Sequence, residues 1–216
     1  MASHPILNPE KAMIWRIMHR DNLPWILDNG LHCSSSNAKS PDWVNIGNQD
    51  LIDKRASRRV PLPPHGCLND YVPFYFTPFS PMLLNITTGY GGIKKRSNEE
   101  IVILVSSLRH IAAQGLAFLF TDSHAYYQWA NFYSDLTDLD KIDWSLLQEQ
   151  GLQRDPENPA KFERYQAEAL VHLHLPINGL RSIVCYTDNL KQSIEQQLQA
   201  RNLNLTVLTS TKWYFR

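Results

Sequence analysis

The chain has 216 residues, 43% of them hydrophobic, and its 21 lysines and arginines balance 21 aspartates and glutamates. This length and apolar fraction fit one domain over residues 1–216, and no apolar run approaches the roughly 18 residues of a membrane span. The zero net charge excludes a strongly basic coat for nucleic acid, though not a local basic groove.

The N-terminal half alternates predicted strands and helices. The apolar run 13–19 predicts a strand, and a helix follows within 20–31, with Asp21 as its N-cap and Gly30 as its stop. A second helix is expected over 48–64, ended by the prolines at 61–64. Two further strands are expected at VPFYF (72–76) and PMLLNIT (81–87).

The C-terminal half continues this mixture. Continuous apolar runs predict buried strands at 101–107 and 116–121, and aromatic residues at helical spacing indicate a helix over 125–136. A strand (179–186), an amphipathic helix (187–202) and a final strand (205–215) close the chain. Because the elements do not repeat as regular βαβ units, the predicted class is α+β.

One carboxylate stands out in the stretch KFERYQAEALVHLHLP (161–176). Apolar residues alternate at Ala169, Val171, Leu173 and Leu175, which predicts a half-buried strand. The same alternation places Glu168 on the other face, at the start of the strand. A solvated glutamate at a strand end is the plain interpretation of this stretch alone.

The cysteines and histidines do not predict a metal site. Cys33, Cys67 and Cys185 are odd in number, widely spaced and without a CxxC pair, so we expect reduced thiols and a cytoplasmic protein. No signal-peptide pattern is evident at the N-terminus. His172 and His174 could ligate a metal as an HxH pair, but exposed neighbours on one strand are the alternative, since no third ligand is evident.

Cations and aromatic side chains together suggest a phosphate-bearing, base-containing ligand, held by ion pairing and stacking. A solvated helix face is the alternative for Arg58 and Arg59. The cations are Arg16, His19, Lys54, Arg55, Arg58, Arg59, Lys94, Lys95 and Arg96, and the aromatic residues are Tyr71, Phe74, Tyr75, Tyr126 and Tyr127. The sequence contains no GxGxxG, Walker A, HExxH or GxSxG motif.

A series of motifs in a fixed order resembles the DarT family, bacterial toxins that ADP-ribosylate DNA. DYVPFYFTPFSPML is the most distinctive of them, and the resemblance extends over nearly the whole chain. The others are IMHRDNLPWILDNGL, IGNQDLIDKRASRRV, FTDSHA, RYQAEALV and the final KWYF.

This resemblance implies an ADP-ribosyltransferase fold, with two facing, mostly antiparallel sheets, flanking helices and NAD in the cleft between them. It further implies transfer of ADP-ribose to a base of single-stranded DNA, most often thymine in a short sequence context, with release of nicotinamide. The implied partner is an antitoxin similar to DarG, whose macrodomain removes the modification. NAD is the only cofactor implied, as a substrate.

Three residues match catalytic positions of the family. Glu168 matches the catalytic glutamate, Arg55 an arginine thought to assist the acceptor base, and His124 a histidine near the active site. Two positions depart from the family pattern. Arg16 stands where many relatives carry a histidine that binds NAD, and Phe79 stands where several have arginine.

The chemistry of NAD cleavage suggests further roles. As nicotinamide leaves, the ribose gains oxocarbenium character, which a carboxylate beneath the sugar stabilises. We expect Glu168 to do this and to accept the thymine N3 proton, while Arg55 stabilises the developing base anion. The expected cofactor contacts are Arg16 with a phosphate, His19 and Asn22 with ribose or nicotinamide, and Tyr75 and Met82 with the nicotinamide ring.

For DNA, the loop 140–165 is expected to form part of the acceptor groove, because it leads directly to Glu168. Trp144 could stack on a base or be a core residue, and the sequence leaves both open. The predicted DNA-binding residues are Lys54, Lys141, Trp144, Arg154 and Arg164. Two alternatives remain: a transferase acting on guanine, RNA or protein, and a nucleic-acid-binding module without catalysis.

Overall fold

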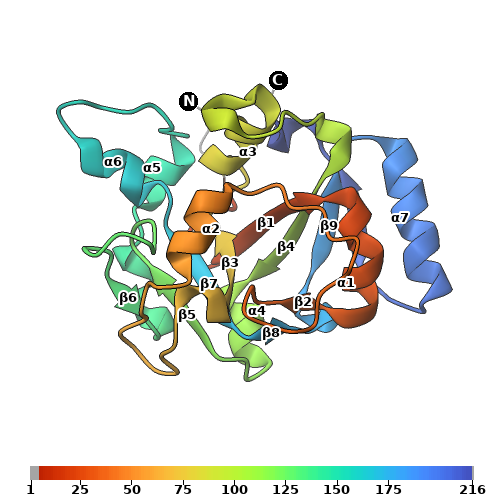
Figure 1. The fold of residues 1–216 in the computed structure, drawn as a ribbon, viewed down its shortest axis with the longest axis horizontal. Coiled ribbons are helices and arrows are strands. Elements are labelled where there is room, and N and C mark those ends of the chain that lie inside the picture. Colours follow the sequence, from red (N-terminus) through yellow and green to blue (C-terminus); the bar gives the residue numbers. More distant parts are fainter. Residues whose placement is uncertain (1–4, 216) are drawn as a thin grey trace.

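A computed structural model describes residues 5–215, and a mixed eight-stranded sheet forms its centre (Figure 1). The strand order is β10-β9-β4-β1-β3-β7-β5-β6, and all neighbours pair antiparallel except β9 and β10. A separate two-stranded ladder joins β2 and β8. The strands are β1 (Met13–His19), β2 (Leu31–His32), β3 (Tyr71–Tyr75), β4 (Ile101–Ser107), β5 (Phe118–Thr121), β6 (Phe132–Tyr133), β7 (Glu168–His172), β8 (His174–Leu175), β9 (Ser182–Cys185) and β10 (Thr206–Thr209).

Helices flank this sheet, and most of them are short. The longest, α7, packs at one side of the molecule, whereas α2 lies over the region of β3 and β7 (Figure 1). The helices are α1 (Leu23–Asn29), α2 (Gln49–Arg55), α3 (Pro81–Thr88), α4 (Leu108–Ala113), α5 (Trp144–Gln148), α6 (Pro159–Arg164) and α7 (Asp188–Ala200). Short 3-10 turns lie at 20–22, 68–70, 90–92, 98–100, 136–141, 177–179 and 211–213.

The strands expected at 13–19, 72–76, 101–107 and 116–121 are confirmed to within three residues. Their side chains account for much of the core, since every residue of β4 is buried. The helix expected over 20–31 is confirmed, with Gly30 at its C-cap, but its N-cap is Asn22, not Asp21. The amphipathic helix over 187–202 is confirmed as α7.

Three local predictions are wrong. The segment 81–87 is a helix, α3, because Ser80 caps it and Pro81 opens its first turn. The segment 125–136 forms turns and the short strand β6, not a helix. The helix expected over 48–64 is confined to α2.

The prediction of an alternating strand over 169–175 also needs correction. β7 lies inside the sheet between β3 and β5, and residues 168–171 are buried whichever face they point to. Leu173 was expected to point into the core, but it is 49% exposed and its backbone is left-handed, with φ of 58°. This residue separates β7 from β8.

Candidate active site

The sheet register buries the predicted catalytic glutamate. Glu168 opens β7 opposite Tyr75 of β3, and Tyr75 in turn pairs with Trp15 of β1. On its other side, the Glu168 backbone N–H donates to the Thr121 hydroxyl at the end of β5 (3.1 Å). Glu168 is only 4% exposed, so the interpretation as a solvated strand-end residue is wrong.

Three groups make four contacts with the buried carboxylate. Nη1 of Arg55, from the last turn of α2, lies 3.1 and 2.9 Å from the two carboxylate oxygens. The Ala125 backbone N–H donates to Oε1 (3.1 Å), and His124 Nδ1 lies 3.0 Å from the same oxygen. The three predicted catalytic residues therefore meet at one point, although 113 positions separate Arg55 from Glu168.

These partners decide the protonation state of Glu168. Burial on its own would raise the pKa of the carboxyl group, but the charge of Arg55, then His124 and the Ala125 N–H, favour the carboxylate and lower the pKa to about 2. The group is therefore ionised at neutral pH. Stabilisation of a sugar cation requires this negative charge.

This shift predicts how stability depends on pH. Because the pKa of Glu168 falls from 4.5 to about 2 on folding, its contribution to stability is fully present above about pH 4.5 and is lost as the pH falls towards 2. Urea unfolding of the wild type and Glu168→Gln should give a free-energy difference that is constant from pH 6 to 8. Between pH 4.5 and 3 the wild type should lose stability relative to Glu168→Gln. A free-energy difference that stays constant over the whole pH range would contradict the lowered pKa of Glu168.

The Glu168 cluster opens into a cavity of about 530 Å³, within the range of small-molecule and cofactor sites. One wall comes from β1, β3, β7, α2, α3 and the loop after β5. It includes Arg16, Arg55, Tyr75, Met82, His124 and Glu168. The opposite wall comes from α1, β2 and the segment 33–48, which passes in front of the sheet (Figure 1). Its aromatic side chains are Trp25, His32 and Trp43.

Arg16 is a partly buried cation that lines this cavity. Its Nη1 donates to the Pro73 carbonyl (2.7 Å), whereas Nε has no hydrogen-bond partner among the described residues. Burial first, and the charge of Arg55 second, lower the pKa of Arg16 to about 10, so it remains charged at neutral pH. A cation with an unused buried donor is suited to an anionic group such as a phosphate.

The other predicted cofactor residues differ in their geometry. Tyr75 and Met82 both line the cavity, with Tyr75 Oη 4.0 Å from Met82 Sδ. Burial, followed by the charge of Glu168, raises the pKa of the Tyr75 phenol well above its usual range, so it stays neutral. Asn22 also reaches the cavity, but its amide holds Val44 through two 2.8 Å bonds to the backbone. Asn22 therefore positions the segment 33–48.

The predicted cofactor contact of His19 is not supported by this geometry. Its side chain is buried but is absent from the cavity lining. His19 Nδ1 accepts the Asp21 backbone N–H (3.2 Å), and Nε2 lies near Arg96 (3.4 Å) and Glu100 (3.5 Å). The side chain therefore helps to fix the turn after β1.

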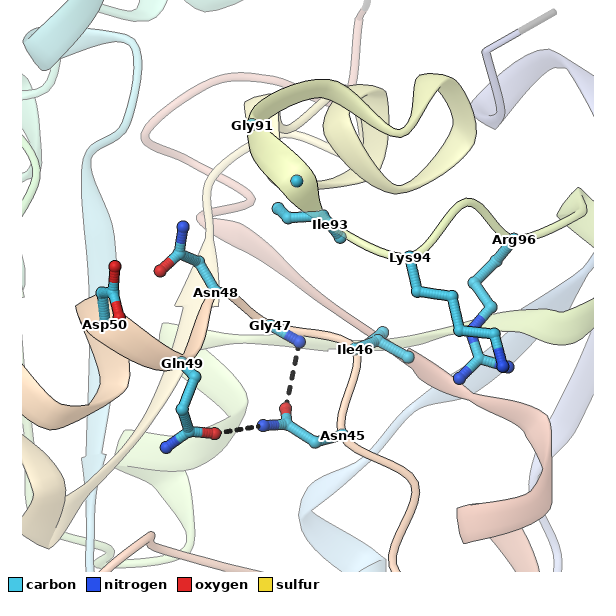
Figure 2. Close-up of a pocket in the computed structure, with 11 residues that line it drawn as sticks. Asn45, Ile46, Gly47, Asn48, Gln49, Asp50, Gly91, Ile93, Lys94 and Arg96 are labelled. Carbon is cyan, nitrogen blue, oxygen red and sulfur yellow. Dashed lines mark hydrogen bonds between the residues drawn. The ribbon is translucent and has the colours of Figure 1, made fainter.

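A second hollow, of about 300 Å³, lies between the segment 45–50 and the loop after α3 (Figure 2). Lys94 and Arg96 extend at one end of it, and Asn48 and Asp50 lie at the other. The bond between Asn45 Nδ2 and Gln49 Oε1 (2.9 Å) supports this wall from within (Figure 2). Residues 45–49 line both hollows, so this segment separates them.

The family model described as DarT, ssDNA thymidine ADP-ribosyltransferase, matches residues 15–215. The chain belongs to the DarT family. Its identity to a DNA ADP-ribosyl transferase of Escherichia coli O127:H6 is 60% over 209 residues, covering 97% of this chain and 96% of the relative. A DNA ADP-ribosyl transferase of Thermus sp. strain 2.9 is 35% identical over 214 residues, covering 96% and 98%.

Solved structures agree with this assignment. Thermus sp. 2.9 DarT in complex with ADP-ribosylated ssDNA superposes with a TM-score of 0.87, at 32% identity over 96% of this chain and 98% of that one. The same protein in complex with NAD+ gives 0.83, at 32% identity over 96% and 99%. The predicted α+β fold and the predicted enzyme class are therefore confirmed.

All five residues predicted to bind DNA lie outside the lining of this cavity. Lys54 is exposed on α2, and Lys141 pairs with Asp140 (3.3 Å) on the surface. Arg154 lies over the Phe162 ring (4.8 Å), and Arg164 Nε pairs with Asp143 (3.2 Å). Their contacts with DNA stay predictions, and two of these cations already have carboxylate partners.

Trp144 is a core residue, so the prediction that it stacks on a base is not supported. Its ring is 9% exposed and packs edge-on against Phe76, with centroids 5.6 Å apart. Its Nε1–H donates to the Leu139 carbonyl (2.7 Å). Burial and this bond fix the indole inside the protein.

Trp144→Ala should consequently lower the free energy of unfolding by about 3–5 kcal/mol, because it leaves a cavity and an unpaired carbonyl. Urea titration measures this loss, and Trp144→Phe should recover part of it by refilling the cavity. A loss below about 1 kcal/mol would contradict the core assignment.

The departure at Phe79 is explained by packing. Phe79 is 5% exposed and lies edge-on to Phe215, and its carbonyl accepts the Tyr165 hydroxyl (3.1 Å). The phenyl ring thus belongs to an apolar contact with the C-terminal segment.

The HxH pair does not converge on one point. Leu173 turns the chain, and His174 packs on His32, with ring centroids 4.2 Å apart, whereas His172 contacts Tyr71. Within residues 5–215, no group of three or more His, Cys, Asp or Glu side chains is placed to hold a metal ion.

Proposed function

We propose that this DarT-family chain cleaves NAD and transfers ADP-ribose to a thymine of single-stranded DNA, in a sequence-dependent way, with release of nicotinamide. The observation that carries the proposal is a buried, ionised Glu168, held by Arg55 and His124, in the lining of a cavity of about 530 Å³. Relatives with these ligands support it, namely the Thermus DarT complexes with NAD+ and with ADP-ribosylated ssDNA.

Glu168 supports bond cleavage by its charge. The bond between ribose C1′ and the nicotinamide nitrogen breaks, and nicotinamide leaves with the electron pair, which neutralises its ring. C1′ becomes cationic, and a carboxylate beneath it lowers the energy of that state. Thymine N3 then bonds to C1′, and its proton passes to Glu168.

Arg55 is suited to assist both partners of the reaction. Nη1 is engaged by the Glu168 carboxylate, but Nη2 is buried and has no hydrogen-bond partner among the described residues. We assign Nη2 to a carbonyl oxygen of thymine next to N3, where negative charge develops as the proton leaves. The planar guanidinium lets one side chain hold both groups.

The remaining cavity residues are assigned to NAD. Arg16 binds a phosphate through its free Nε, and Tyr75 and Met82 pack on the nicotinamide ring. His124, whose Nδ1 lies 3.0 Å from Glu168 Oε1, orients the carboxylate. Lys54, Lys141, Arg154 and Arg164 are assigned to the DNA backbone outside the cavity.

The biological setting follows from the family. We infer that the chain is the toxin of a toxin–antitoxin pair and blocks DNA replication, and that its antitoxin is a DarG-like macrodomain protein that removes the modification. A cytoplasmic location is part of this proposal, and the three free cysteines are consistent with reducing conditions. None of the helices in residues 5–215 combines the length and apolar character of a membrane span.

Mass spectrometry of single-stranded oligonucleotides incubated with NAD tests the proposal. Thymine-containing oligonucleotides should gain one ADP-ribose, located on the base by fragmentation, and matched oligonucleotides without thymine should not. A duplex of the same sequence should react more slowly, because extrusion of a base costs a few kcal/mol. Modification of guanine, RNA or protein alone would overturn the assignment of the acceptor.

A further inference from the structure

A row of aromatic rings leads from the buried carboxylate to the protein surface. His124 Nδ1 lies 3.0 Å from Glu168 Oε1, and the His124 ring contacts Tyr127 edge-on, with centroids 5.6 Å apart. Trp129 stacks on Tyr127 at 4.8 Å, with only 12° between the ring planes. Three consecutive rings thus connect the catalytic carboxylate with solvent.

The outermost ring is exposed but held in place. Trp129 is 61% exposed, yet its Nε1–H donates to Glu163 Oε2 (2.6 Å). The Glu163 carbonyl accepts the backbone N–H of His124 (3.0 Å), so the same residue also anchors the inner end of the row. Arg58 Nη2 donates to the Tyr127 carbonyl (2.9 Å). The stacked pair is therefore preorganised, so binding of a ligand would cost little side-chain entropy.

Sheet topology places this row at the same end of the sheet as Glu168. β5 and β7 are antiparallel, so β5 ends at Thr121 where β7 begins at Glu168. Residues 122–131 consequently leave the sheet at the same end as Glu168. Arg58, three residues beyond the end of α2, joins this segment to the helix that carries Arg55.

We propose that Trp129, backed by Tyr127, is a stacking platform for a nucleobase that flanks the target thymine in single-stranded DNA. This inference rests on the proposed function. Aromatic side chains bind unpaired bases by stacking. With the target thymine held at Glu168, the base stacked on Trp129 would belong to a neighbouring nucleotide of the same strand. The Glu163 carboxylate, which accepts the Trp129 Nε1–H, repels phosphates beside the row, so the row favours a base. The phosphates then follow the cationic side, at Arg58 and Lys54.

An abasic scan combined with mutation tests the platform. Single-stranded oligonucleotides carry one target thymine and an abasic site at each flanking position in turn, and kcat/KM is measured for the wild type and Trp129→Ala. At one flanking position, loss of the base should lower kcat/KM of the wild type by about tenfold or more. Trp129→Ala should show a similar loss with the intact oligonucleotide, and little further loss at that abasic site.

Three controls separate stacking from other effects. Trp129→Phe keeps an aromatic face and should retain most of the activity, whereas Trp129→Leu should resemble alanine. Tyr90→Ala removes another exposed ring (69% exposed) and should behave as the wild type. Cleavage of NAD without DNA should be unchanged in all four variants, which also shows that they are folded.

Two outcomes overturn the inference while leaving the proposed function intact. One is equal sensitivity of the wild type and Trp129→Ala to every abasic site. The other is an unchanged kcat/KM in Trp129→Ala, which would indicate that Trp129 and Tyr127 bind a protein partner and not DNA. If the wild type itself modifies no oligonucleotide, the proposed function fails, and the two failures are thereby distinguished.

Discussion

Replacement of Glu168 by glutamine should lower the rate of DNA ADP-ribosylation by about a thousandfold, combining the loss of an electrostatic stabiliser with the loss of a base. The amide keeps the shape of the side chain and an oxygen that can accept the Ala125 N–H. The amide lacks the negative charge of the wild-type carboxyl group, which is ionised at neutral pH because its pKa is about 2. The effect should therefore appear in the chemical step and not in NAD binding.

Single-turnover rates with saturating NAD and a thymine oligonucleotide measure this effect, and NAD binding is measured separately by titration. Glu195→Gln is a matched control, because Glu195 is exposed on α7 at the other side of the molecule (Figure 1). In cells, the same substitution should relieve growth arrest. A Glu168→Gln protein that modifies DNA at a wild-type rate would remove the basis of the mechanism.

The central strands could be predicted from the sequence because their signal is local. The continuous apolar run 101–107 has no interpretation other than a buried element, and it forms β4. α3 shows how the same kind of run misleads. Residues 81–87 resemble a strand, although Ser80 before α3, Pro81 at its first position and Gly89 after it are helix boundary signals. Gly89 adopts the left-handed conformation.

The prediction of a helix over the aromatic segment 125–136 was wrong for a different reason. Helical spacing of aromatic residues predicts a helix only if one face is buried, and here Trp129 faces solvent while Ala125 is buried. The backbone N–H of Ala125 is instead directed at Glu168 (3.1 Å). The Glu168 carboxylate thus binds the backbone of a loop more than 40 positions away, which no local pattern encodes.

The burial of Glu168 is likewise a property of the sheet order. Its environment depends on β3 and β5 as neighbours of β7, and on Arg55 from α2. Without the family resemblance, the residues around Glu168 predict only a solvated strand end. The aromatic wall at Trp25, His32 and Trp43 was missed, because it forms only when the segment 33–48 folds back over the sheet.

Replacement of Arg55 by alanine should reduce DNA ADP-ribosylation by about a hundredfold or more, with a smaller effect on NAD cleavage without DNA. Nη1 orients Glu168 in both reactions, whereas Nη2 serves only a thymine acceptor in our assignment. Because Arg55 is the main cause of the low pKa of Glu168 and burial acts in the opposite direction, its loss should also raise that pKa. The acid limb of the pH–rate profile should therefore move to higher pH.

Two comparisons make this prediction specific. Arg55→Lys keeps the charge but lacks the second donor of the planar guanidinium, so it should preserve the acid limb and still lose much of the DNA-dependent rate. Arg181→Ala removes an exposed arginine at the start of β9 and should leave both rates unchanged. Equal losses of DNA modification and NAD cleavage in Arg55→Ala would mean that Arg55 only orients Glu168. The acceptor thymine would then lose its proton without help from a cation, which the buried, unpartnered Nη2 argues against.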